Sequence, residues 1–205
     1  VKAIVIACNT ASALALDAVR GEFDVPVMGV VIPGARAAVE ATRNRKVGVV
    51  GTDATVQSGM YTKIIHEMAP DVTVIEKACP LFVPLVEEGF KDHVVTQEII
   101  EYYLESMRSS DIDAMILGCT HYPLLRSKIR EYMGEKIQIV NPAYETAMDL
   151  KKLLHEQGME NSGETDRHSR YSFYVSDAAE KFRRFANTVM PFDVPTTNVV
   201  NIEEY

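Results

Sequence analysis

Residues 4–12 read Ile-Val-Ile-Ala-Cys-Asn-Thr-Ala-Ser, and residues 115–123 read Met-Ile-Leu-Gly-Cys-Thr-His-Tyr-Pro. Each stretch is a short apolar run, a small residue, a cysteine and a polar run that leads into a helical pattern. A small residue allows a tight turn between a strand and a helix. The two stretches therefore predict two β-strands, each followed by a cysteine near the start of a helix.

The same alternation continues along the chain, where short runs of Val, Ile and Leu separate longer amphipathic stretches. The predicted strands are 3–6, 27–31, 46–50, 72–76, 114–117, 137–140, 171–175 and 199–202. The predicted helices are 11–20, 34–42, 56–68, 96–108, 124–133, 145–157 and 178–186. Several strands are continuous apolar runs, as expected of parallel strands covered on both faces. The pattern predicts an α/β fold with parallel sheets.

Composition limits the class of protein. The chain has 205 residues, 47% of them hydrophobic and 24% charged, which is typical of a globular protein. Its net charge is −8, and no segment gathers Lys and Arg, which disfavours nucleic-acid binding. No apolar run approaches the roughly 20 residues that cross a bilayer. Three widely spaced cysteines predict free thiols in a reducing cytoplasm rather than a disulfide framework.

Two further features concern the extent of the folded part. The chain opens directly on the strand-like run that begins at Val1, without Met or a leader, so the native protein is expected to extend upstream. The stretch 158–170 is polar, contains two glycines and has no periodicity. It is predicted to be an exposed loop.

The two cysteines in matching contexts, Cys8 and Cys119, are the candidates for chemistry. In open α/β sheets ligands bind at the carboxyl ends of parallel strands. A helix start favours an anion and can lower a thiol pKa from its usual value of about 8.5. The pair thus suggests two half-sites that face each other across a cleft. A cysteine that ends a buried strand also serves as core filler. Cys79 is assigned to that class, and for the other two the residues alone leave both interpretations open.

At this point the motifs resemble a known family. Residues 7–12 and 118–124 resemble the two signature motifs of glutamate racemases, within the aspartate/glutamate racemase superfamily. Residues 51–55 and 84–89 look like further family segments, and the resemblance covers essentially the whole chain. Two departures stand out. The Asp-Ser-Gly segment at the start of the family is absent, which leaves turnover by this chain alone open. Asn141-Pro142 stands where relatives tend to carry Asp-Ser.

The resemblance implies two similar doubly wound parallel-sheet domains with the active site in the cleft between them. One domain is expected to comprise residues 35–139. The other is expected to be discontinuous, formed by residues 1–31 and 141–205, with its N-terminal part missing. A homodimer is one open arrangement, since family members dimerise in different ways.

The resemblance also implies a function, the cofactor-independent racemisation of L- and D-glutamate that supplies D-glutamate for peptidoglycan. Inversion at a carbon requires that a proton leave one face and another arrive at the opposite face. Two acid/base groups that flank the carbon achieve this directly, and thiols titrate near the operating pH. By resemblance, Cys8 takes the proton from D-glutamate and Cys119 takes it from L-glutamate.

Further site residues are assigned around the two thiols. Asn9, Thr10 and Thr120 directly follow the cysteines and are candidate donors to the substrate carboxylate. Thr52 and Thr55 are candidates for a second carboxylate, although ordinary helix caps explain them equally well. By resemblance, His121 assists Cys119 and Glu87 acts near His121. The alternative for His121 is a turn residue with a solvent-facing ring. No metal site and no cofactor are assigned.

The sequence leaves several alternative functions open. One is an acyl-transfer enzyme in which Cys119 is the nucleophile and His121 the base, although such a base usually lies far away in sequence. Another is a racemase of the same superfamily that acts on aspartate or hydantoins. A third is a catalytically inactive binding module. The weakest is a zinc site formed by Cys8, Cys119 and His121, which lacks the usual ligand spacing.

Overall fold

The computed structural model describes residues 1–161 and 171–204, which fall into two compact units, Val1–Glu160 and Asn161–Tyr205. The first unit contains β1 (Ile4–Ile6), α1 (Asn9–Glu22), β2 (Val27–Gly29), α2 (Val31–Ala41), β3 (Lys46–Gly51), α3 (Asp53–Gln57), α4 (Met60–Met68), β4 (Thr73–Ala78), α5 (Phe82–Glu87), η1 (Phe90–Asp92), α6 (Val94–Arg108), β5 (Ala114–Gly118), η2 (Tyr122–Leu125), α7 (Arg126–Met133), β6 (Gln138–Val140) and α8 (Pro142–Glu156). The second unit contains β7 (Tyr174–Val175), α9 (Ala179–Val189), β8 (Asn198–Val199) and the 3₁₀ turn η4 (Ile202–Glu204).

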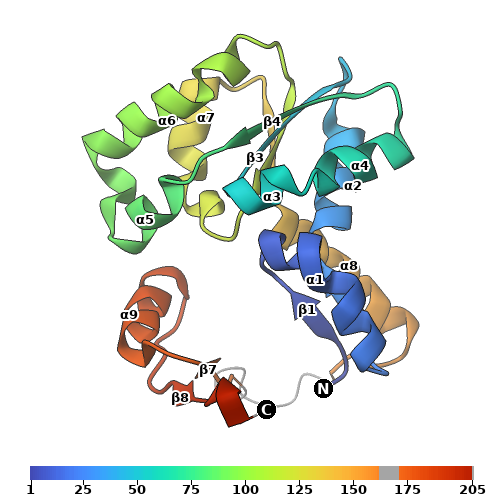
Figure 1. Ribbon diagram of the computed structural model, residues 1–205, viewed down its shortest axis with the longest axis vertical. Coiled ribbons are helices and arrows are strands. Elements are labelled where there is room, and N and C mark those ends of the chain that lie inside the picture. Colours follow the sequence, from blue (N-terminus) through green and yellow to red (C-terminus); the bar gives the residue numbers. More distant parts are fainter. Residues whose placement is uncertain (162–170, 205) are drawn as a thin grey trace. The chain divides into compact units, whose positions relative to one another are not determined.

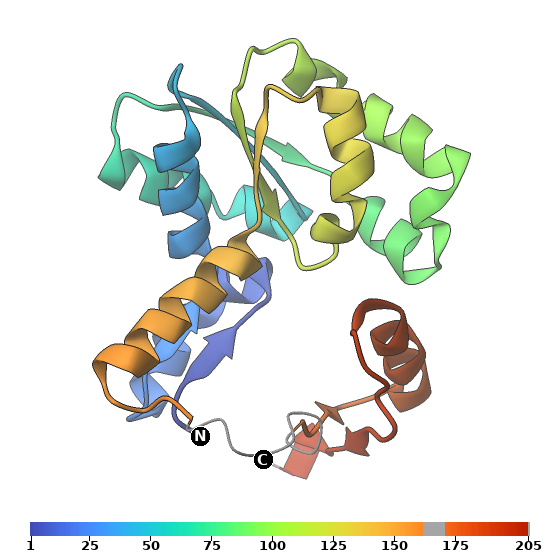
Figure 2. The same ribbon diagram turned by 180° about the vertical axis from the view of Figure 1, so that it is seen from behind.

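The strands form parallel sheets, as predicted. The first unit holds the two-stranded sheet β1–β2 and a four-stranded sheet in the order β4–β3–β5–β6, and the second unit holds the pair β7–β8. Helices α2 and α4 lie on one side of the four-stranded sheet, and α6 and α7 lie on the other (Figures 1 and 2). This is the doubly wound arrangement expected of parallel strands with crossover helices.

The central strands β3 and β5 are almost completely buried because helices cover both faces. Val47 and Val49 join the core beneath α2 and α4, which burial of apolar surface stabilises. The strands run in register, and the last pair is Gly51 opposite Gly118. The loops that follow β3 and β5 therefore start side by side, which places the segments after Gly51 and Gly118 at one edge of the sheet.

The predicted helix 56–68 is wrong in one respect, because it is two helices. α3 ends at Gln57 and α4 begins at Met60. Between them Gly59 has φ +60°, a left-handed conformation that glycine adopts without steric cost. The break changes the direction of the chain and places Tyr61 in the first turn of a new helix, where its side chain is only 1% exposed.

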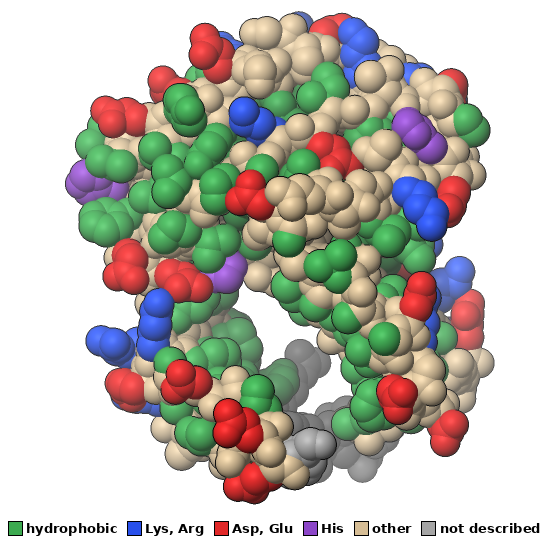
Figure 3. Space-filling view, viewed as in Figure 1, with side chains coloured by type: hydrophobic (Ala, Val, Ile, Leu, Met, Phe, Trp, Pro, Cys, Tyr) green, Lys and Arg blue, Asp and Glu red, His purple; other side chains and the backbone are tan. Residues whose placement is uncertain are grey.

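The predicted domains, 1–31 with 141–205 and 35–139, divide the chain differently from the two compact units, and that division stays a prediction. Most of the predicted loop 158–170, from 162 onward, lies outside the described residues. No helix within residues 1–161 and 171–204 is both long and apolar enough to span a membrane. On the face shown in Figure 3, lysine and arginine side chains are scattered among acidic ones.

Candidate active site

Cys8 occupies the turn between β1 and α1. It is the N-cap residue of α1, with extended backbone angles of φ −73° and ψ 124°. Its carbonyl oxygen accepts the first helical hydrogen bond, from the N–H of Ser12 at 2.8 Å. The Cys8 side chain is exposed and, among the described residues, makes no capping hydrogen bond. The thiol thus lies at a strand end and a helix start, as predicted, and is free to react.

Cys119 follows β5 directly and is only 8% exposed. Burial raises the pKa of its thiol, and a negative charge on Cys8 raises it further. Backbone N–H groups of His121 and Tyr122 and the side chain of Thr120 oppose this shift but do not outweigh it. The predicted lowering of the thiol pKa is therefore wrong for Cys119. The segment after Cys119 forms a short 3₁₀ turn, η2, instead of an α-helix. The loss of solvation of the buried thiolate therefore outweighs the hydrogen bonds that lower the pKa of Cys119.

Cys8 is among the charged groups whose field raises the pKa of the Cys119 thiol. A thiolate at Cys8 therefore disfavours a second thiolate at Cys119. Such a pair favours one thiolate and one neutral thiol over two thiolates.

The raised pKa of Cys119 gives a testable pH dependence. Iodoacetamide reacts with the thiolate, so its rate follows the thiolate fraction. Alkylation of Cys119 is expected to keep rising with pH above about 8.5, where the rate of an unperturbed thiol levels off. Mass spectrometry of the Cys119 peptide after timed alkylation measures this, with N-acetylcysteine as the reference thiol. A midpoint at or below that of the reference contradicts the effect of burial.

Cys119, His121 and Glu87 form a connected group. The Cys119 Sγ lies 3.8 Å from Nδ1 of His121, and Nε2 of the same ring lies 3.3 Å from Oε1 of Glu87. Thr120 Oγ1 also lies 3.2 Å from Nδ1 of His121. The His121 side chain is 22% exposed and that of Glu87 is 34% exposed, so neither is fully solvated. The imidazole thus bridges a thiol and a carboxylate, an arrangement suited to moving a proton.

Three threonine hydroxyls form a second group. Thr10 Oγ1 lies 2.9 Å from Thr52 Oγ1 and 3.0 Å from Thr55 Oγ1, and the latter two are 3.0 Å apart. Thr52 also caps α3 by accepting the N–H of Thr55 at 3.3 Å. The cap interpretation of Thr52 thus holds in the structure. These three hydroxyl contacts connect the start of α1, next to Cys8, with the segment that follows β3.

Two tyrosines that are not among the predicted site residues form hydrogen bonds with residues around the site. Tyr61 donates its hydroxyl hydrogen bond to Asn9 Oδ1 at 2.6 Å, and both residues are buried. The Tyr122 hydroxyl lies 2.9 Å from the carbonyl oxygen of Gly51 and 2.7 Å from that of Cys79. The position of Tyr122 inside the second cysteine motif is a usable signal. Tyr61 gives none, because the pattern around it predicts one uninterrupted helix.

The remaining cysteine, Cys79, is core. It is 0% exposed, and burial raises its pKa to about 12, so the thiol stays neutral in the physiological range. This agrees with its assignment as core filler. Within the described residues no three His, Cys, Asp or Glu side chains come close enough to hold a metal ion, so the zinc alternative has no support there.

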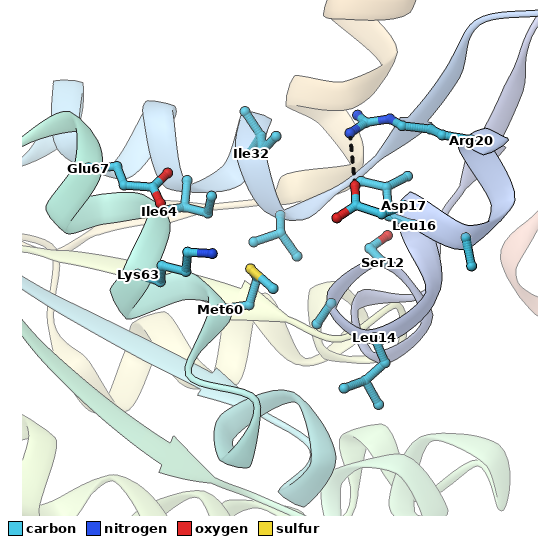
Figure 4. A pocket seen from close by; sticks show the side chains of 13 residues that line it. Ser12, Leu14, Leu16, Asp17, Arg20, Ile32, Met60, Lys63, Ile64 and Glu67 are labelled. Atoms are coloured by element: carbon cyan, nitrogen blue, oxygen red, sulfur yellow. Dashed lines mark hydrogen bonds and ion pairs between the residues drawn. The ribbon is translucent and has the colours of Figure 1, made fainter.

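A cavity of about 190 Å³ lies elsewhere in the first unit, between α1, α2 and α4. Figure 4 shows Lys63 and Met60 of α4 facing Ser12 and Leu16 of α1 across it. Its lining contains neither cysteine and none of the predicted site residues. The predicted residues instead gather around the ends of β1, β3 and β5.

Fold and site together define the class, an α/β protein in which two cysteines follow parallel strands of different sheets. A sequence profile described as Asp/Glu/Hydantoin racemase matches residues 1–149, and the chain belongs to this family. It is 43% identical over 187 residues to a glutamate racemase of Geobacter metallireducens, across 91% of this chain and 68% of that one.

Solved structures agree with the sequence match. Glutamate racemase from Bacillus anthracis superimposes with a TM-score of 0.92 at 36% identity, over 98% of this chain and 74% of that chain. Glutamate racemase from Francisella tularensis, solved in complex with D-glutamate, gives a TM-score of 0.90 at 32% identity over 100% and 75% of the two chains. The expected racemase fold is thereby confirmed.

Proposed function

We propose that this protein interconverts L- and D-glutamate without a cofactor, with Cys8 and Cys119 as the acid/base pair. The observation that carries the proposal is that two cysteines, Cys8 and Cys119, each follow the carboxyl end of a parallel strand, with Cys8 at the start of α1. The relatives named above are glutamate racemases, and one was solved with D-glutamate. The reaction supplies D-glutamate for peptidoglycan and takes place in the cytoplasm.

The mechanism requires one thiolate and one thiol on opposite faces of the α-carbon. The thiolate removes the α-proton, the carbon becomes carbanion-like, and the opposite thiol delivers its proton to the other face. Burial favours the neutral thiol at Cys119, which suits it to the acid role when D-glutamate is bound. Reaction in that direction leaves Cys8 as thiol and Cys119 as thiolate, ready for the reverse reaction.

The surrounding polar groups stabilise charge during the reaction. The hydroxyls of Thr10 and Thr120 and the amide of Asn9 are placed beside the thiols and can donate to the substrate carboxylate, which delocalises the developing charge. His121 stands between Cys119 and Glu87, so it can relay a proton to or from the buried thiol. Thr52 and Thr55 contribute by holding the Thr10 hydroxyl in place.

One observation favours a second candidate. The contact of 3.8 Å between Cys119 Sγ and His121 Nδ1 also suits a nucleophilic cysteine with its general base, as in acyl transfer. That function leaves Cys8 without a role. It predicts an acyl-cysteine on Cys119, detectable as a mass increase after incubation with an activated acyl substrate.

The deciding experiment uses the full-length protein in heavy water with L- and D-glutamate in separate samples and no added cofactor. Proton NMR follows the α-proton while optical rotation follows the enantiomers. Loss of the α-proton together with interconversion is the expected result. No exchange from either enantiomer rejects glutamate, and exchange from aspartate or a hydantoin in the same assay would move the substrate within the family.

A further inference from the structure

Tyr61 lies between the two cysteine-bearing turns. Its hydroxyl donates to Oδ1 of Asn9 at 2.6 Å, and Asn9 directly follows Cys8. On the other side its ring packs against Gly118, where a Cβ atom would lie 3.3 Å from Cε2 of Tyr61. Gly118 directly precedes Cys119. A single side chain from α4 therefore contacts the neighbours of both thiols.

The position of Tyr61 is tightly fixed. The residue is 1% exposed and belongs to the core beneath α2 and α4. The next residue, Thr62, is anchored to β4, since Oε1 of Glu76 accepts its N–H at 3.2 Å and its hydroxyl at 2.5 Å. An aromatic ring that is buried and anchored in this way acts as a rigid spacer, because close-packed interiors leave little room for movement.

The hydrogen bond also fixes the Asn9 amide. Burial raises the pKa of the Tyr61 phenol, and the charge of Glu76 raises it further, so the phenol stays protonated and donates. An amide that accepts through Oδ1 must direct its Nδ2 hydrogens elsewhere. The Asn9 amide is thereby held with its oxygen toward Tyr61 and its NH₂ group directed away from the Tyr61 hydroxyl.

We propose that Tyr61 is a positioning residue for the racemisation, which sets the separation of the two cysteine-bearing turns and the orientation of the Asn9 amide. The inference rests on the proposed function and deepens it. Tyr61 does not touch the reacting atoms. It acts through Asn9 on one side and through Gly118 on the other.

A double-mutant cycle tests this. Tyr61→Phe keeps the ring and removes the hydroxyl, and it is expected to lower kcat/KM about tenfold in both directions, because Asn9 loses its partner. In an Asn9→Ala background the same substitution is expected to cost less than about twofold. Equal losses in both backgrounds, or no loss in the wild-type background, would overturn the proposal.

The control is Tyr103→Phe. Tyr103 is another buried tyrosine and packs against Phe82 rather than against a cysteine-bearing turn. The kcat/KM of the Tyr103→Phe variant is expected to stay within about twofold of the wild-type value. A loss at Tyr103 as large as that at Tyr61 would show that any buried hydroxyl matters, and would count against a special role for Tyr61.

Two further measurements separate failure of this inference from failure of the proposed function. If the wild-type protein does not racemise glutamate, the alkylation rates of Cys8 and Cys119 still report on the two turns. Tyr61→Phe is expected to change at least one of those rates, and two unchanged rates would reject the positioning role. If the variant does not fold, NMR of the Asn9→Ala protein serves instead. The resonance of the buried Tyr61 hydroxyl proton, observed in the wild-type protein, is expected to shift or disappear, and an unchanged resonance rejects the hydrogen bond.

Discussion

Cys8→Ser and Cys119→Ser are each expected to lower the interconversion of L- and D-glutamate by at least about a thousandfold. General acid/base catalysis contributes factors of about 10² to 10⁴, and in the proposed mechanism both proton transfers pass through these side chains. A serine hydroxyl keeps the size and a hydrogen-bonding group but does not ionise near neutral pH. The assay is α-proton exchange in heavy water with optical rotation, started separately from each enantiomer.

The matched control is the third cysteine. Cys79 is 0% exposed, and burial raises its pKa to about 12, so it takes no part in proton transfer near neutral pH. Cys79→Ala is expected to keep kcat within about twofold while it lowers stability, since it removes a buried sulfur. Near-normal turnover in either the Cys8 or the Cys119 variant would contradict the two-thiol mechanism.

Much of the fold could be predicted from the sequence because the central strands β3 and β5 of the four-stranded sheet are largely apolar runs. β3 and β5 are buried on both faces, and such strands leave a clear signature in Val, Ile and Leu. The break between α3 and α4 at Gly59 could not be predicted from the sequence in the same way. An isolated glycine within a helical pattern is usually tolerated, and only the packing of Tyr61 shows why the chain bends there.

The sequence predicts the residues of the candidate site, and their assignment stays a prediction, but it does not predict how they are arranged in space. The cysteines and their polar neighbours were found because polar residues follow apolar strands at two comparable places. The direction of the pKa shift at Cys119 was not, because burial and donor contacts act in opposite senses and only coordinates decide which dominates. The contact of Tyr61 with Asn9 spans two elements distant in sequence, and no local pattern indicates such a pair.

Gly118→Ala is expected to lower kcat about a hundredfold, although it adds only one methyl group. A Cβ atom at this position would lie 2.8 Å from the carbonyl oxygen of Val50 in the paired strand β3, closer than real Cβ contacts come. The obstacle is backbone, so the end of β5 must move and carry Cys119 with it. Misplacement of a catalytic group by about 1 Å can cost a factor of about 10².

Gly21→Ala is the control for Gly118→Ala. It tests whether a loss of activity comes from the steric clash at Gly118 or from the replacement of any glycine. Gly21 lies in α1, and no atom of the described residues comes within 4 Å of the point that a Cβ would occupy, so alanine fits without strain. Alanine favours the helix, and Gly21→Ala is expected to raise the free energy of unfolding by about 0.5–1 kcal/mol with unchanged kcat. Denaturant unfolding and the racemisation assay measure both quantities. If Gly118→Ala keeps full activity and its Cys119 alkylation rate is that of the wild type, then the close approach of β5 to β3 does not set the position of the thiol.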